Sequence, residues 1–263
     1  MENNTLCNRH SLGVNNHTKM YVTYTRIYGW SDYGGESSYQ PGYRLENMMW
    51  MTLLVYDYII PGERKMRLAV VGSINTDMTV TAERIPLKGE TLMGSSLSYI
   101  PGGKGANQAV AMAKLGAEVE MFGCVGDDSN GEKMLENLKA VGVGTEHIQI
   151  LKGVPTGIAM ITVGDNDNTI IVVPGANGKV DRAYIDSIKS ELEKFDMVVL
   201  QHEIPLETVH YVIEFCYEKG IKIVLNPAPA AAVPMEIIDK VTYVTPNEHE
   251  AVLIFGDKLS TED

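Results

Sequence analysis

From Met66 onward, short apolar runs alternate along the chain with segments in which apolar residues recur every three or four positions. The runs have the length of buried strands, whereas the longer segments are typical of amphipathic helices. Glycine marks the ends of several helical segments. The predicted strands are residues 67–73, 118–126, 156–163, 169–174, 195–201, 221–227 and 240–246, and the predicted helices are residues 105–115, 129–140, 181–194, 205–219 and 247–255.

The alternation of strands and helices predicts an α/β protein with a parallel sheet. The segment "GDNDN" (164–168) indicates a hairpin turn between two strands, because it lacks the downstream Gly and Glu of a calcium-binding loop. Asp127 and Asp128 are adjacent, but Ser129 and Gly131 follow them, so we expect a turn and a helix cap there. Ligands of parallel α/β sheets bind at the carboxyl ends of the strands.

The pattern changes at Met66. Residues 1–65 hold both tryptophans and most of the tyrosines, carry as many basic as acidic residues, and show no sustained helical or strand period through residues 1–45. The junction "PGERKM" can be encoded by purine-rich codons that resemble a bacterial ribosome-binding site. One hypothesis is therefore that Met66 is the natural start and that residues 1–65 are a translated leader. The alternative is a genuine aromatic-rich extension.

Composition limits the class of protein. The chain has 263 residues, of which 44% are hydrophobic, and a formal net charge of -12, so nucleic acid and anionic membranes are not expected partners. The 3 cysteines form no Cys-x-x-Cys pair, which argues against a disulfide framework or a zinc knuckle. The most apolar run, residues 48–60, is too short to span a bilayer, and no signal peptide opens the chain. We expect a cytoplasmic protein.

Polar residues follow several predicted strands. Asn75 and Asp77 come after the first strand and, being two apart, can point the same way. A carboxylate beside an amide can accept hydrogen bonds from neighbouring hydroxyls and donate to them, although a turn with Asx capping explains the pair equally well. Glu203 follows the strand at 195–201, where an acid is also favoured simply because a helix starts. Asn247 and Glu250 follow the strand at 240–246 and are also spaced as a capping box.

The stretch "YIPGGKGANQAVAMAKLG" (99–116) places glycines, Lys104 and Asn107 at a helix start. It is not a Walker loop, because Gly rather than Ser or Thr follows Lys104. A tight loop is one interpretation. The other is a ligand cradle, in which backbone N–H groups and the positive end of the helix approach an oxygen-rich molecule. Because several polar groups gather at successive strand ends around this loop, we favour a site for a polyhydroxylated ligand.

The order "GSINTD", "GGKGANQAVAMAKLG", "GCVGDDSNGE", "LQHEIP", "LNPAPA" and "TPNEHEA" resembles the ribokinase-like (phosphofructokinase B) family of sugar kinases across residues 66–263. The paired Asn-x-Asp and "GGKGANQA" favour the branch of that family that phosphorylates D-ribose to ribose 5-phosphate. The resemblance implies a parallel-sheet sandwich with a small β-sheet lid at about residues 78–100, formed by 78–82 and 91–100. It also implies a homodimer that pairs through this lid.

The resemblance further implies roles for particular residues. The sugar-binding residues would be Asn75, Thr76, Asp77, Gly103, Lys104, Gly105, Ala106, Asn107 and Glu203. Asn247 would lie beside the ATP phosphates, and Glu250 would order Mg²⁺ through water. A kinase for another sugar or nucleoside of the family remains the alternative.

The family's catalytic signature, a Gly-Ala-Gly-Asp segment, does not occur in these 263 residues. Its aspartate is the base that acts on the sugar hydroxyl, and its N–H groups hold the transferring phosphate. By the same resemblance, the catalytic aspartate, the adenine pocket and the K⁺ loop would lie beyond Asp263. We therefore expect the C-terminally truncated, sugar-binding part of a kinase that is inactive by itself, or else a non-catalytic sugar-binding remnant.

Overall fold

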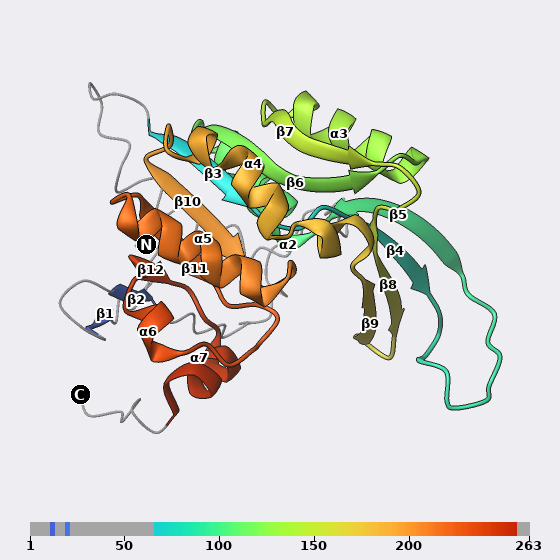
Figure 1. The fold of residues 1–263 in the computed structure, drawn as a ribbon. Helices are drawn as coiled ribbons and strands as arrows, with labels where there is room; N and C mark the ends of the chain where they lie inside the picture. The colour runs from blue at the N-terminus through green and yellow to red at the C-terminus, as the bar shows by residue number, and fades with distance from the viewer. Residues whose placement is uncertain (1–10, 14–18, 22–65, 257–263) are drawn as a thin grey trace, which may run out of the picture.

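The computed structural model describes residues 11–13, 19–21 and 66–256 (Figure 1). Its larger sheet has eight strands, all parallel except the first, which pairs antiparallel with its neighbour. In spatial order they are β1 (Ser11–Gly13), β2 (Lys19–Tyr21), β12 (Tyr243–Val244), β11 (Lys222–Asn226), β10 (Met197–Gln201), β3 (Arg67–Val71), β6 (Glu118–Gly126) and β7 (Gly144–Leu151).

Helices cover both faces of this sheet, because the central strands are apolar on both sides. On β3, Leu68 and Val70 pack with the buried faces of α2 (Lys104–Lys114) and α3 (Ser129–Ala140). Ala69 and Val71 belong to a second cluster on the opposite face. Its helices are α4 (Arg182–Leu192), α5 (Leu206–Glu218), α6 (Met235–Ile238) and α7 (Glu248–Phe255), and the short 3₁₀ helix η1 (Gly175–Lys179) adds to it. The body is a three-layer α/β/α sandwich, as the sequence predicts.

A second sheet projects from one side of this body (Figure 1). In spatial order its strands are β5 (Ser96–Gly102), β4 (Asn75–Thr81), β8 (Gly157–Gly164) and β9 (Asp167–Val173). The predicted lid segments supply β4 and β5. The hairpin predicted around "GDNDN" is confirmed, with Asp165 and Asn166 at positive φ in its turn, and it supplies the other two strands. This second sheet, here called the lid, is therefore larger than the range 78–100 that the resemblance implies.

The order of the strands identifies where a ligand binds in such a sheet. From β3 the chain moves to β6 and β7 on one side, and then returns to β10, β11 and β12 on the other. The strand order therefore reverses between β3 and β10. Crevices at the carboxyl ends of such a pair are the usual ligand sites of parallel α/β sheets. The lid begins at the same point, because β4 follows β3 after three residues.

The structure contains three strands that the sequence analysis did not predict. Strand β7 was not predicted, because "GTEHIQIL" mixes polar and apolar residues on a strand at the edge of the sheet. Strands β1 and β2 lie within residues 1–45, where the sequence shows no sustained period, and they extend the sheet beside β12. Strands of three residues are too short to show a period. The rest of residues 1–65 lies outside the described residues, so the leader hypothesis stays a prediction.

The helix caps agree with the sequence. Asp128 is the N-cap of α3, and its carboxylate accepts from Gly131 N at 2.8 Å and from Thr156 N at 2.8 Å. The predicted turn and cap at Asp127 and Asp128 are therefore confirmed. Among the described residues, no helix combines the length and the apolar character that crossing a bilayer requires.

Candidate functional site

Glu203 joins the two halves of the sheet at the point where the strand order reverses. It lies between β10 and α5, and its Oε2 accepts from Ser73 Oγ at 2.6 Å and from Lys104 N at 2.9 Å. Ser73 follows β3, and Lys104 is the first residue of α2. A carboxylate at a helix N-terminus interacts favourably with the free N–H groups and with the helix dipole. Glu203 therefore holds the glycine loop against the ends of β3 and β10.

The glycine loop fits closely against the turn between β3 and β4. Gly103 has φ 90°, and a Cβ there would lie 2.7 Å from Asn75 N. A Cβ on Gly105 would lie 2.7 Å from Ser73 N. Neither position has room for a side chain, because the obstructing atoms are backbone. Here the tight-loop interpretation of these glycines holds.

The N–H groups of this loop bond to the protein itself. Gly105 N donates to Ser73 Oγ at 3.3 Å, Ala106 N donates to Ser73 O at 2.9 Å, and Asn107 N donates to Gly103 O at 2.8 Å. Together with the Lys104 N–H on Glu203, these bonds occupy the first turn of α2. The cradle interpretation therefore needs correction at these four N–H groups, because Glu203, Ser73 and the Gly103 carbonyl already accept their hydrogen bonds.

Asp77 is the second acid of the site. It lies on β4, and Gly102 of β5 faces it so closely that a Cβ there would be 2.2 Å from Asp77 Oδ1. Burial raises the pKa of Asp77 to about 6, and the nearby charge of Glu203 adds to this rise while that of Lys104 opposes it. The structure thus brings Asp77, Glu203 and Lys104 together, although 126 positions separate the two acids in the sequence. Gly102 is a member of this group that the sequence analysis missed.

Asn75 and Thr76 begin β4 and are both buried. The Asn75 Oδ1 atom accepts from Asn177 Nδ2 at 2.7 Å, and Asn177 belongs to η1. Because Asn75 and Asp77 are two apart on one strand, their side chains leave it on the same side. The Asx-cap interpretation of the pair is wrong, since both residues lie in a strand paired on both sides.

A second group of polar residues lies at the carboxyl ends of the neighbouring strands β11 and β12. Asn247 caps α7, where it accepts from Glu250 N at 2.8 Å, and its own N–H donates to Glu250 Oε2 at 2.9 Å. The capping box that the spacing allows is therefore present. Asn226 ends β11, and its buried Oδ1 has no hydrogen-bond partner among the residues that the structure describes. Strands β11 and β10 lie between β12 and β3. Because neighbouring strands are about 4.8 Å apart, the ends of β12 and β3 are roughly 14 Å apart.

The protein alone does not assemble a metal centre in the part of the chain that the structure describes, which contains no group of three His, Cys, Asp or Glu suited to one. Both carboxylate oxygens of Glu250 take part in bonds to Asn247. Mg²⁺ commonly binds through one or two carboxylates together with waters and substrate phosphates. An oxygen-lined edge that holds Glu250 and Asn226 Oδ1, which has no partner in the described part of the chain, is compatible with that mode.

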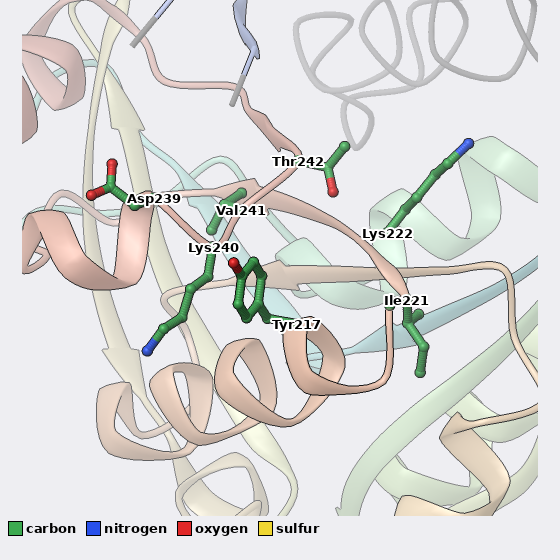
Figure 2. A pocket seen from close by; sticks show the side chains of 8 residues that line it. Tyr217, Ile221, Lys222, Asp239, Lys240, Val241 and Thr242 are labelled. Atoms are coloured by element: carbon green, nitrogen blue, oxygen red, sulfur yellow. The ribbon is translucent and has the colours of Figure 1, made fainter. Parts of the chain in front are cut away.

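A pocket of about 280 Å³ lies elsewhere in the molecule. Its lining includes Tyr217 at the end of α5, Lys222 at the start of β11 and Thr242 just before β12 (Figure 2). These residues lie at the amino ends of parallel strands, whereas the acids lie at the carboxyl ends. The pocket is therefore not part of the candidate site.

This arrangement defines a class of protein: a three-layer α/β/α sandwich with a β-sheet lid that opens onto a cluster of acids, amides and glycines. The family model for the pfkB family carbohydrate kinases matches residues 65–263. The chain therefore belongs to the pfkB family of carbohydrate kinases.

Three similar proteins within this family are ribokinases. The ribokinase of Bacillus subtilis is 47% identical over 195 residues, which are 74% of this chain and 67% of that protein. The ribokinase of Lactococcus lactis is 45% identical, with 72% of this chain and 63% of that protein covered. The solved structure of Arabidopsis thaliana ribokinase with ribose and ATP has a TM-score of 0.64 and 31% identity, covering 73% of this chain and 64% of that one. The chain spans about two thirds of the length of these relatives.

The raised pKa of Asp77 gives a stability prediction. A carboxyl group whose pKa is higher in the folded than in the unfolded state lowers the free energy of unfolding as the pH rises through that window. For Asp77 the window runs from about 4 to about 6. We expect Asp77→Asn to be more stable than the parent by about 2–3 kcal/mol at pH 7, with the difference disappearing near pH 4. Urea unfolding at both pH values measures this difference.

Asp127→Asn is the matched control, because it removes an exposed carboxylate away from the site. Its free energy of unfolding should stay within about 0.5 kcal/mol of the parent at both pH values. Equal stability of Asp77→Asn and the parent at pH 7 would show that the pKa of Asp77 is not raised in the folded protein.

Proposed function

We propose that this chain is the sugar-binding part of a ribokinase, which transfers the γ-phosphoryl group of ATP to D-ribose and forms ribose 5-phosphate. The observation that carries the proposal is the group formed by Asp77 and Asn75 of the lid strand β4 with Glu203 and Lys104 of the body. The 47% identity to a ribokinase supports the choice of sugar. The composition supports a cytoplasmic location.

The proposed sugar site combines acceptors with donors. Glu203 uses Oε2 for Ser73 and the loop, so Oε1 is the atom that would accept from a hydroxyl. Asp77 offers a second carboxylate from the lid side. Lys104 and Asn75 supply donors, and Asn107 stands one turn into α2. Gly103, Gly105, Ala106 and Thr76 shape the loop and strand that hold these groups.

The proposed nucleotide site lies at the ends of β11 and β12. Asn247 would contact the phosphates of ATP, and Glu250 would hold Mg²⁺ through water. When bound with ATP, Mg²⁺ would offset the negative charge on the transferring phosphoryl group. The protein's own part is to fix Asn247 and Glu250 through their reciprocal hydrogen bonds, so that neither side chain has to be ordered when the nucleotide arrives.

The sugar-binding prediction concerns Asp77. We expect Asp77→Ala to weaken D-ribose binding by about 1.5–3 kcal/mol, because it removes a charged acceptor from sugar hydroxyls. In the parent, affinity should also fall as the pH drops below about 6, since Asp77 then becomes protonated. Titration calorimetry of the 263-residue chain at pH 5 and pH 7 measures both effects.

Glu207→Ala is the matched control, because it removes an exposed acid from the first turn of α5. Unchanged ribose affinity in Asp77→Ala would show that the sugar site has been placed wrongly. D-glucose serves as the comparison ligand and should bind more weakly than ribose, because the lid is expected to close over a pentose.

We further propose that residues 1–263 bind ribose without phosphorylating it. No carboxylate among the described site residues is left to act as the base: Glu203 and Glu250 hold the glycine loop and the α7 cap, and Asp77 faces the sugar. The resemblance assigns the base to a Gly-Ala-Gly-Asp segment, which these residues do not contain. A non-catalytic sugar-binding protein is the second candidate.

The activity prediction separates these two candidates. The 263-residue chain should show no ribose-dependent ATP consumption above background in a coupled assay. Adding a C-terminal segment that carries Gly-Ala-Gly-Asp should produce activity, and changing its Asp to Asn should remove it again. Activity of the extended chain supports the kinase, and its absence supports the non-catalytic protein. Ribose 5-phosphate formation by the 263-residue chain alone would contradict the proposal that it lacks a base.

The outer face of the lid supports a homodimer. Residues paired directly across the strands share one face, and Tyr99, Met78, Met160 and Ile171 form such a row across all four strands. Tyr99, Met160 and Ile171 are each about half exposed or more, as is Leu97 one pair further along. An apolar face that runs across a whole sheet is costly in water and typical of an interface. A second copy of this lid offers a face of the same shape and polarity.

The assembly prediction follows from this row of side chains. Met160→Glu should shift the chain from dimer to monomer in sedimentation velocity runs, because it places a charge at the centre of the apolar face. Met93→Glu is the control, since Met93 is 90% exposed in the loop between β4 and β5, away from this face. A dimer that persists in Met160→Glu, or a parent that is monomeric, would contradict the lid interface.

A further inference from the structure

Asn177 is a fully buried polar residue to which the sequence analysis gave no role. It lies in η1, after the last lid strand, and only 1% of its surface is exposed. Its amide makes three hydrogen bonds to the start of β4. Ile74 N donates to Asn177 Oδ1 at 2.9 Å, and Asn177 Nδ2 donates to Ile74 O at 3.2 Å and to Asn75 Oδ1 at 2.7 Å.

The backbone of Ile74 determines which way the Asn177 amide points. An N–H group requires an acceptor and a carbonyl requires a donor, so Oδ1 must face Ile74 N and Nδ2 must face Ile74 O. The second proton of Nδ2 is then directed at Asn75. An Asn75 amide turned the other way would place two donors against each other in a buried position, at a considerable cost. Asn75 must therefore present Oδ1 to Asn177.

Gly157 makes this arrangement possible. A Cβ at this position of β8 would lie 2.2 Å from Asn177 Nδ2 and 2.3 Å from Asn75 Oδ1. The two amides meet over a bare stretch of backbone, and Gly157 pairs directly with Asn75 in the lid sheet. The contact therefore links the lid strands to η1 at the point where β4 leaves the body.

We propose that Asn177 is a positioning residue that fixes the Asn75 amide with its NH₂ group toward the sugar, so that Asn75 acts as a hydrogen-bond donor. This inference rests on the proposed sugar-binding function of the site. Each sugar hydroxyl both donates and accepts. Asp77 and Glu203 are acceptors when ionised, so the site needs donors to pair with hydroxyl oxygens. Asn177 makes Asn75 one of them.

A double-mutant cycle tests whether Asn177 acts through Asn75. Asn177→Asp keeps the shape and the acceptor for Ile74 N but loses both donors, so the Asn75 amide should rotate and turn Oδ1 toward the sugar. We expect ribose to bind about tenfold more weakly. In an Asn75→Ala background, Asn177→Asp should change ribose affinity less than twofold. An equal loss in both backgrounds would overturn the proposal.

Asn168→Asp is the matched control, because it introduces the same charge at an exposed position of β9. Ile213→Ala, which opens a cavity in α5, controls for loss of stability alone. Neither should change ribose affinity. If Asn177→Asp does not fold, Asn75→Asp takes its place: its carboxylate still accepts from Asn177 but offers no donor, and ribose affinity should again fall about tenfold. Unchanged affinity in Asn75→Asp would overturn the proposal.

A measurement without ligand distinguishes failure of this proposal from failure of the proposed function. Hydrogen exchange of the Asn177 side-chain amide, followed by NMR, should be slow for both protons in the parent. In Asn75→Ala, the proton directed at Asn75 should exchange at least tenfold faster, while the proton on Ile74 O stays slow. No change in Asn75→Ala would overturn the positioning role. Slow exchange with this response, combined with unchanged ribose binding in Asp77→Ala, would instead overturn the sugar site.

Discussion

The bond between Glu203 and the first turn of α2 is the interaction on which the site depends. It joins the end of β10 to the glycine loop, and through Ser73 it reaches the end of β3. These are the two strands between which the order of the sheet reverses. An acid at this position satisfies N–H groups of the helix and also places a negative charge where a ligand binds. One carboxylate thus stabilises the fold and forms part of the site.

The charge on Glu203 has a consequence for Asp77. Burial disfavours ionisation of Asp77, and the charge of Glu203 adds to this effect, so the pKa of Asp77 rises to about 6. In the proposed sugar site, a ligand rich in hydroxyl groups would relieve this repulsion, because it would donate hydrogen bonds to both carboxylates. Under this proposal, binding of the sugar would remove an interaction that is unfavourable in the unliganded protein. Strained groups of this kind are commonly found at functional sites.

Glycine positions determine how closely the parts of the site approach one another. Gly103 and Gly105 let the loop lie on the β3–β4 turn, Gly102 leaves room for the Asp77 carboxylate, and Gly157 leaves room for the contact between Asn75 and Asn177. In each case a Cβ would meet an atom at less than 3 Å. These glycines therefore allow close packing of backbone and side chains at the place where β4 leaves the body. The N–H groups of Lys104, Gly105 and Ala106 bond to the protein rather than to a ligand.

The sequence by itself determined the alternation of strands and helices, the caps at Asp128 and Asn247 and the hairpin at residues 164–168, because these depend on local spacing and on neighbouring residues. It also identified Asp77 and Glu203 as candidates, since acids directly after strands are visible in the chain. Only the tertiary structure decided that the hairpin completes the lid, that "GTEHIQIL" forms an edge strand, and that Ser73, Gly102 and Asn177 belong to the site. Those features arise from contacts between residues up to 130 positions apart, and no local pattern records such a contact.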